Sequence, residues 1–160
     1  MKKAVYAGSF APVHLGHIYI LQQACQLFDE VHILLATNSE KHSLFSVDFR
    51  LELLFAATKT MQNIKVVHLN GLVASYMQEQ DIEYAVRGVR NGTDFSYEQT
   101  MAFANSKLNT NCKSIFLPTK QELAHISSSL VRECLLYGRE IAEFVPKEVA
   151  LLLQKYPNGK

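Results

Sequence analysis

Two histidines follow a turn of small residues near the start of the chain, in the stretch Gly8-Ser9-Phe10-Ala11-Pro12-Val13-His14-Leu15-Gly16-His17. An apolar run at 4–7 precedes the turn, and a segment with helical periodicity follows at 18–28. A strand that turns into a helix presents backbone N–H groups at the helix N-terminus, where phosphate binds. His14 and His17 lie near one face of such a helix and could hold a metal or donate to phosphate. Because no HExxH pattern or cysteine partner accompanies them, we predict phosphate contact and no metal site on the protein.

Other polar residues that suit phosphate follow the later apolar runs of the chain. Lys41 lies in the polar loop after 31–36, Arg87 and Arg90 follow the run at 82–86, and three serines at 127–129 follow the run at 114–117. Guanidinium groups bind phosphate in a bidentate manner, and Gly88 allows a sharp turn between the two arginines. In isolation the arginines could be a solvated face and the serines a helix cap. Their shared position after successive strands favours a phosphate site.

The elements that must position these residues alternate between strand-like and helix-like segments. Strands are expected at 4–7, 31–36, 64–69, 82–86 and 114–117, with helices at 18–28, 47–61, 72–80, 95–108, from 127 to the stop at Gly138, and 146–155. Near-continuous apolar strands separated by helices are typical of parallel sheets covered on both faces. We therefore predict one Rossmann-like α/β domain over 1–160, with a doubly wound five-stranded parallel sheet and its ligands at the carboxyl ends of the strands.

The composition restricts the class of protein. The chain has 160 residues, 48% of them apolar, and a net charge of +1, which gives no electrostatic basis for binding nucleic acid or a membrane surface. Its three cysteines are widely spaced and form no CxxC pair, as expected for free thiols in a reducing compartment. No apolar run reaches the length of a membrane span or a secretory signal. These features predict a soluble cytoplasmic protein.

Three motifs together resemble a known family. The first stretch resembles the HxGH signature of the nucleotidyltransferase superfamily, and Ile126-Ser127-Ser128-Ser129-Leu130-Val131-Arg132 resembles its second, ISSS-type signature. Within that superfamily, Arg87-Gly88-Val89-Arg90 followed by Asp94-Phe95-Ser96-Tyr97-Glu98 is similar to the pattern of phosphopantetheine adenylyltransferases. The resemblance spans nearly the whole chain, with the motifs in the same order and at compatible spacing.

This resemblance implies an activity and a set of site residues. The family transfers the adenylyl group of ATP to 4′-phosphopantetheine, giving dephospho-coenzyme A and pyrophosphate. The resemblance also implies that Mg²⁺ enters with ATP and that the protein forms a homohexamer. It further implies coenzyme A as a feedback inhibitor. Carried over by motif, the catalytic residues are His14, His17, Lys41 and Arg90. The residues implied to bind the acceptor are Ser9, Lys41, Val73 and Arg87. Those implied to bind ATP are Ser9, Phe10, His17, Gly88, Arg90, Glu98, Ser127, Ser128, Ser129 and Arg132.

The mechanism expected from these residues is in-line attack without a covalent enzyme intermediate. No serine or cysteine has an evident base partner, and a phosphate acceptor is already anionic at neutral pH. The protein then has to hold two anions together and stabilise the charge that grows on the α-phosphate. Mg²⁺ is expected to be bound mainly by phosphate and water.

One residue departs from the family pattern. Ala11 stands where the pattern has an aspartate, which would fix the loop by hydrogen bonds. Two other functions are therefore considered: an adenylyltransferase that acts on nicotinate mononucleotide, and a nucleotide-binding homologue with impaired catalysis. A hydride-transferring Rossmann domain is disfavoured because the first turn lacks GxGxxG.

Overall fold

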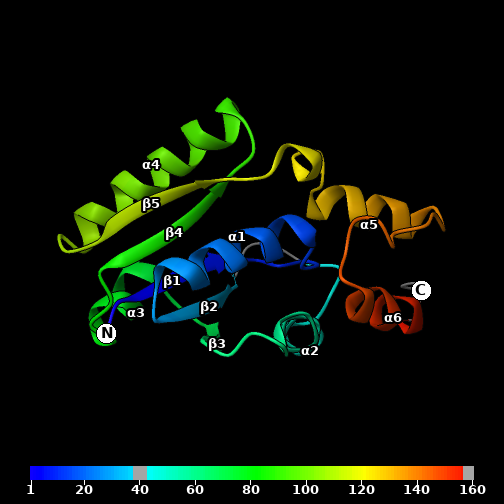
Figure 1. The fold of residues 1–160 in the computed structure, drawn as a ribbon, viewed down its shortest axis with the longest axis horizontal. Helices are drawn as coiled ribbons and strands as arrows, with labels where there is room; N and C mark the ends of the chain where they lie inside the picture. Colours follow the sequence, from blue (N-terminus) through cyan, green and yellow to red (C-terminus); the bar gives the residue numbers. More distant parts are fainter. Residues whose placement is uncertain (38–42, 157–160) are drawn as a thin grey trace.

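The computed structural model describes residues 1–37 and 43–156, and within them strands alternate with helices (Figure 1). The strands are β1 (Lys3–Gly8), β2 (Glu30–Ala36), β3 (Ile64–Leu69), β4 (Tyr84–Val89) and β5 (Lys113–Pro118). The helices are α1 (Leu15–Leu27), α2 (Val47–Thr58), α3 (Val73–Glu79), α4 (Gly92–Leu108), α5 (Ser128–Leu136) and α6 (Lys147–Lys155), with a short 3-10 helix η1 (Gln121–Leu123) before α5.

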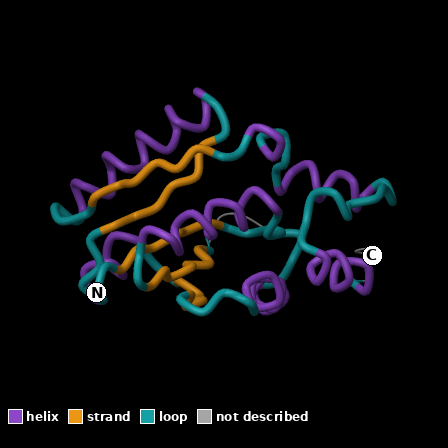
Figure 2. The backbone as a smooth tube through the Cα atoms, in the orientation of Figure 1, coloured by secondary structure: helices purple, strands orange, loops and turns teal. Residues whose placement is uncertain are grey.

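The five strands form one sheet in the order β3-β2-β1-β4-β5, and every neighbouring pair is parallel. The chain moves outward from β1 to β3 and then crosses back to β4 on the other side of β1 (Figure 2). The predicted doubly wound five-stranded parallel sheet is thus confirmed. The order of the strands reverses between β1 and β4, which is where open α/β sheets bind their ligands.

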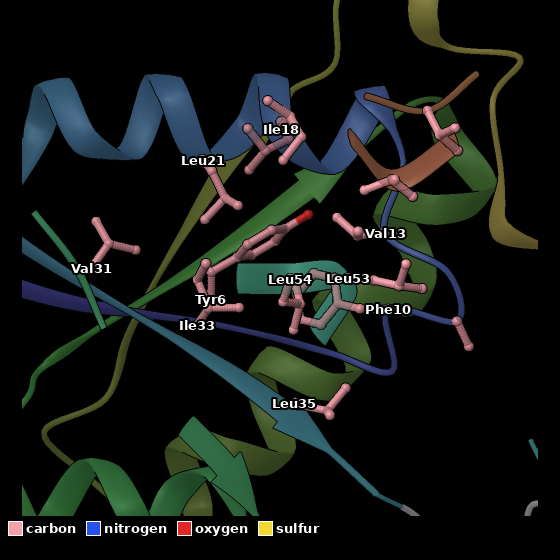
Figure 3. Packing of buried hydrophobic residues seen from close by; sticks show 14 of the residues in the cluster. Tyr6, Phe10, Val13, Ile18, Leu21, Val31, Ile33, Leu35, Leu53 and Leu54 are labelled. Atoms are coloured by element: carbon pink, nitrogen blue, oxygen red, sulfur yellow. The ribbon is translucent and has the colours of Figure 1, made fainter. Parts of the chain in front are cut away.

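Alternate residues of β1 supply two separate apolar layers. Ala4 and Tyr6 belong to the larger cluster, which includes side chains of α1, α2, α5 and α6. Val5 faces a smaller cluster with Met77 of α3 and Leu34 of β2. Figure 3 shows Tyr6 in the larger cluster, where its side chain lies near Leu21 and Ile33. The period-two alternation of a central strand is what allows both faces of the sheet to be covered.

Helices α5 and α6 lie beyond the carboxyl end of β5 (Figure 1). The backbone N–H of Leu15, at the start of α1, donates to the carbonyl of Phe144 at 2.9 Å. Tyr156 stacks on Phe49 of α2, with ring centroids 4.4 Å apart. The chain after α5 therefore packs against the beginnings of α1 and α2. None of the described helices combines the length and apolar character of a membrane span.

Two boundaries differ from the sequence-based prediction in ways that affect the site. Helix α1 begins at Leu15 rather than at 18, because His14 caps it. Strand β4 extends to Val89, so Arg87 and Gly88 do not follow β4 but lie inside it, where both pair with residues of β5. The predicted turn at Gly88 is wrong. A side chain there is disfavoured by packing instead, since a Cβ would lie 2.9 Å from the side chain of Ile20 on α1 and would force it to shift.

Candidate active site

A cleft of about 450 Å³ opens at the carboxyl ends of β1 and β4, between the beginnings of α1 and α5. Residues of β1 and its following loop form one wall, residues of β4 and α4 form another, and the start of α5 closes the site. It is lined by Val5, Tyr6, Ala7, Gly8, Ser9, Phe10, His14, Gly16, His17, Ile20, Val73, Ala85, Val86, Arg87, Gly88, Arg90, Asp94, Tyr97, Glu98, Thr119, Ser127, Ser128, Ser129 and Arg132. This position at the reversal of strand order is where the topology predicts a ligand.

His14 and His17 form a reciprocal cap at the start of α1. The backbone N–H of Gly16 donates to Nδ1 of His14, and the backbone N–H of His14 donates to Nδ1 of His17, both at 3.1 Å. The two rings stack with centroids 3.7 Å apart. Each Nδ1 accepts a backbone N–H, so each neutral ring carries its proton on Nε2. The cap thus fixes two imidazole tautomers that keep Nε2–H as the donor for a ligand.

The surroundings of both rings keep them neutral. Burial, together with the positive charge of Arg90, lowers the pKa of His14 to about 4. Burial, the neighbouring His14 and Arg90 hold the pKa of His17 well below its ordinary value. A neutral imidazole that donates Nε2–H can stabilise negative charge without giving up a proton. At neutral pH the pair therefore suits charge stabilisation rather than general acid catalysis.

Three hydrogen bonds hold the carbonyls of the loop between β1 and α1. Arg50 of α2 donates to the carbonyl of Ser9 at 3.0 Å, and Arg132 of α5 donates to that of Ala11 at 2.7 Å. The hydroxyl of Ser128 donates to the carbonyl of Pro12 at 2.9 Å. Within this loop Phe10 has a φ of 42°, in the left-handed region that costs a non-glycine residue on the order of 1–2 kcal/mol. The three donors therefore fix an unfavourable backbone shape beneath the histidines.

Two arginines of the cleft are held by carboxylates of α4. Arg87 donates from Nη1 to Glu98 at 2.6 Å, and its buried Nε has no hydrogen-bond partner within residues 1–37 and 43–156. Arg90 forms a two-pronged pair with Asp94, at 2.8 Å from Nε and 3.2 Å from Nη2. This hydrogen-bonded pairing lowers the pKa of Asp94 and raises that of Arg90. Fixed guanidinium groups lose little rotamer freedom when they bind an anion.

The beginning of α5 contributes a helix N-terminus to the same cleft. The hydroxyl of Ser127 caps the helix by accepting the backbone N–H of Leu130 at 3.0 Å. The earlier N–H groups of the first turn, at Ser128 and Ser129, have no acceptor within the helix. Arg90 donates to the carbonyl of Ile126 at 3.1 Å and so connects β4 to this turn. The capping role and the phosphate role considered for the serines are compatible, since hydroxyls cap while N–H groups stay available.

The comparisons with known proteins agree with this geometry. A model of the cytidylyltransferase-like family matches residues 5–134. A phosphopantetheine adenylyltransferase of Thermotoga neapolitana is 40% identical over 158 residues, 98% of each chain. The enzyme of the same name from Dictyoglomus turgidum is 41% identical over 150 residues, 94% of each chain. One from Lachnoclostridium phytofermentans is 37% identical over 160 residues, 100% of this chain and 98% of the relative. The chain belongs to the phosphopantetheine adenylyltransferase family.

Membership of this family makes the protein a nucleotidyltransferase, as the motifs predicted. Its fold is shared more widely. A crystal structure described as a nicotinate-nucleotide adenylyltransferase from Vibrio parahaemolyticus superposes with a TM-score of 0.75 at 18% identity, over 96% of this chain and 93% of that one. At that identity the likeness concerns the fold.

The structure brings together all the predicted site residues that it describes. In this phosphopantetheine adenylyltransferase family member, every residue assigned by motif lines the cleft except Lys41, which lies outside the described residues. Ser9, His17 and Arg87 come from three different segments and meet there only through the sheet. Their individual roles toward ATP and the acceptor stay predictions.

Several residues of the site were not identified by sequence reasoning. Thr119 lines the cleft directly after β5, and its place after a strand was a signal that could have found it. Asp94 belongs to the motif at 94–98, but its contact with Arg90 is visible only in the structure. Arg50 gave no signal, because an arginine in an ordinary helical segment resembles any surface residue. Tyr6 lies beneath the cleft, where burial and the charge of Glu98 raise the pKa of its hydroxyl.

Proposed function

We propose that this protein transfers the adenylyl group of ATP to 4′-phosphopantetheine, giving dephospho-coenzyme A and pyrophosphate. The observation that carries the proposal is identity of 37–41% over nearly the whole chain to relatives with that name. The cleft supports it, because neutral imidazole donors, two anchored arginines and a helix N-terminus suit a reaction between two phosphate groups. Ala11 does not remove any of these groups.

In the proposed reaction an oxygen of the acceptor phosphate attacks the α-phosphorus of ATP, and the bond to the bridging oxygen of pyrophosphate breaks. Arg87, Ser9 and Lys41 are proposed to hold the acceptor phosphate, and Val73 to contact its apolar arm. Nε2–H of His17 and of His14 would donate to the α-phosphoryl oxygens as negative charge grows there. The acceptor is an anion already, so no general base is required.

The other half of the cleft is proposed to hold the nucleotide. Arg90, Arg132 and the N–H groups at the start of α5 would bind the phosphates that leave as pyrophosphate. Phe10, Gly88 and Glu98 complete this proposed ATP set. Mg²⁺ enters as part of the substrate MgATP. Asp94 and Glu98, the carboxylates of the cleft wall, are both paired with arginines, which fits a metal held by phosphate oxygens and water.

A substrate panel tests this function. Pyrophosphate release would be measured with MgATP and either 4′-phosphopantetheine or nicotinate mononucleotide. We expect turnover with phosphopantetheine alone. Turnover with the mononucleotide alone would replace the proposed acceptor. ATP binding without pyrophosphate release from either acceptor would identify an impaired nucleotide-binding homologue, and an Ala11→Asp variant assayed beside it would show whether the loop is responsible.

The assembly and setting of the enzyme are part of the same proposal. Several large apolar side chains of α4 are exposed, among them Tyr97 and Phe103, at 65% each. We propose that this helix is covered in a homohexamer, which sedimentation of the purified chain would test. The three cysteines are all free, which supports a reducing cytoplasm. Coenzyme A, as a relative of the product, is proposed to compete at the acceptor half of the cleft.

A further inference from the structure

A second cavity, of about 580 Å³, adjoins the cleft, and Arg50, which lines it, has no part in the proposed reaction. It shares Ser9 and Arg132 with the cleft, and Ala11, Ser43, Ser46 and Arg50 also line it. The cavity therefore lies against the loop between β1 and α1 and the beginning of α2. It is a distinct space that contacts the loop whose carbonyls are held by arginines.

Within the described part of the chain, the two arginines of this cavity lack the carboxylate partners that Arg87 and Arg90 have. Arg50 is only 6% exposed; it donates to the carbonyl of Ser9, and its Nε has no hydrogen-bond partner among the residues that the structure describes. Arg132 donates to the carbonyl of Ala11 and to the hydroxyl of Ser129. Within residues 1–37 and 43–156, neither guanidinium has an acidic oxygen within 4.0 Å, whereas Arg87 and Arg90 are both paired. Two positive charges thus flank one cavity with only neutral acceptors.

Arg50 is a buried charge, which is costly without a counter-charge, and Arg132 is partly buried; an anion placed between them removes much of that cost. The hydroxyls of Ser43 and Ser46 each accept a backbone N–H, from Phe45 and Phe49, which leaves their own protons free to donate. Guanidinium forks and hydroxyl donors together are the groups that recognise tetrahedral oxyanions.

We propose that this cavity is a second anion site, separate from the catalytic cleft, which binds a phosphate group between Arg50 and Arg132. Ala11 is the reason that the anion comes from solution. It lines the cavity and has no polar side-chain atom, so the chain supplies no carboxylate at this position. Because Arg50 and Arg132 also hold the carbonyls of Ser9 and Ala11, a bound phosphate would stiffen the loop beneath the histidines.

Nuclear magnetic resonance of the arginine side chains tests the site directly. Inorganic phosphate would be titrated into the nucleotide-free protein at constant ionic strength, with chloride as the balancing anion, while the Nε–H resonances are followed. Arg50→Lys and Arg132→Lys assign the two signals by their loss. We expect both signals to shift along one saturable curve. Signals that do not move, or that move equally with chloride, would overturn the proposal.

Two variants at position 11 provide the matched comparison. Ala11→Asp supplies an internal carboxylate to the same cavity, and we expect it to weaken phosphate binding there about tenfold or more. Ala11→Asn has nearly the same size and no charge, so it should retain most of the affinity. Equal loss in both variants would mean that bulk rather than charge decides, and would contradict an electrostatic site.

Further arms separate this site from the cleft and identify the source of the phosphate. Arg87→Gln removes a cleft arginine, and the shifts of Arg50 should persist in it. If ATP and inorganic phosphate bind together, the site is separate from the cleft, as proposed. If ATP displaces inorganic phosphate from Arg50, the phosphate belongs to the nucleotide site of the cleft, and the proposal is overturned. Neither result depends on turnover, so failure of the proposed reaction would be seen separately by the pyrophosphate assay.

Discussion

Replacement of His17 separates its structural role from its chemical role. Its Nδ1 accepts the backbone N–H of His14, which leaves Nε2–H as the donor for substrate. His17→Ala removes both interactions. His17→Gln preserves the cap in principle, because glutamine at this helix position is the usual partner in a capping box and also carries an amide donor. His17→Ala and His17→Gln therefore differ from each other in both the cap and the donor. His17→Glu keeps the cap and replaces the donor with an anion.

The expected sizes follow from the two interactions. An unsatisfied N–H at the start of α1 costs about 1 kcal/mol, which for a domain of this size lowers Tm by roughly 2–4 °C. Removal of one preorganised donor to a developing oxyanion lowers kcat by about 10²- to 10³-fold. We therefore expect both losses in His17→Ala. His17→Glu should have near-normal Tm with kcat at least as low, and His17→Gln should have near-normal Tm with an intermediate kcat.

Thermal unfolding and steady-state pyrophosphate release are the two assays. His68→Ala serves as the control, since this histidine is exposed and does not line the cleft. A loss in His17→Ala that appears in KM while kcat is kept would refute the transition-state role. A kcat in His17→Gln as low as in His17→Ala would show that an amide donor cannot replace the ring. A low Tm in His17→Glu would refute the capping argument.

Three further outcomes follow from the geometry. The pKa of His14, lowered to about 4 from 6.5, means that the unfolded chain binds the proton first as pH falls. Its contribution to the free energy of unfolding should drop by about 3 kcal/mol between pH 6.5 and 4. Urea titrations should show a shallower profile in His14→Asn, in which the lowered pKa of His17 keeps the rest of the pH dependence. Glu98→Gln should raise KM for phosphopantetheine, because Arg87 loses its 2.6 Å anchor, and also KM for ATP, because Glu98 belongs to the proposed ATP set; an unchanged KM for phosphopantetheine would contradict the anchoring role. Gly88→Ala should cost about 1–3 kcal/mol of unfolding free energy through a 2.9 Å clash, whereas Gly92→Ala, which meets nothing within 4 Å, should cost none.

Most of the fold could be predicted from the sequence because the apolar residues of its strands and helices recur with a regular period. Five apolar runs separated by helical segments specify a parallel sheet, and all five strands lie close to their predicted positions. Boundaries were less accessible. The sequence does not reveal that α1 starts at Leu15, because histidine is not a usual N-cap, and it does not reveal that β4 continues to Val89, because a charged residue such as Arg87 is typical of a loop after a strand. In the structure its backbone stays paired with β5 while its side chain reaches the cleft.

The sequence predicted site residues only where a chemically functional residue type occurred next to a recognisable strand or helix end. Histidines and serines near helix starts have that property, and the structure places them together. The contacts that hold the loop have no such signal. Arg50 lies 41 residues from Ser9 in sequence, and Arg132 lies 121 from Ala11, so each contact exists only once the sheet has formed. Side-chain donors to backbone carbonyls leave no motif, because the acceptor is common to every residue.

The arrangement of the loop explains how the chain can have Ala11 in a family that has a carboxylate in its pattern. A carboxylate at this position would accept hydrogen bonds and neutralise arginine charge. Here the carbonyls of Ser9, Ala11 and Pro12 accept instead, from donors on two different helices. The shape of the loop is thereby held without the carboxylate, while the charge of Arg50 and Arg132 is left without a partner among the described residues. Loop shape and charge balance are therefore separate requirements, and a bound phosphate would meet the second without changing the first.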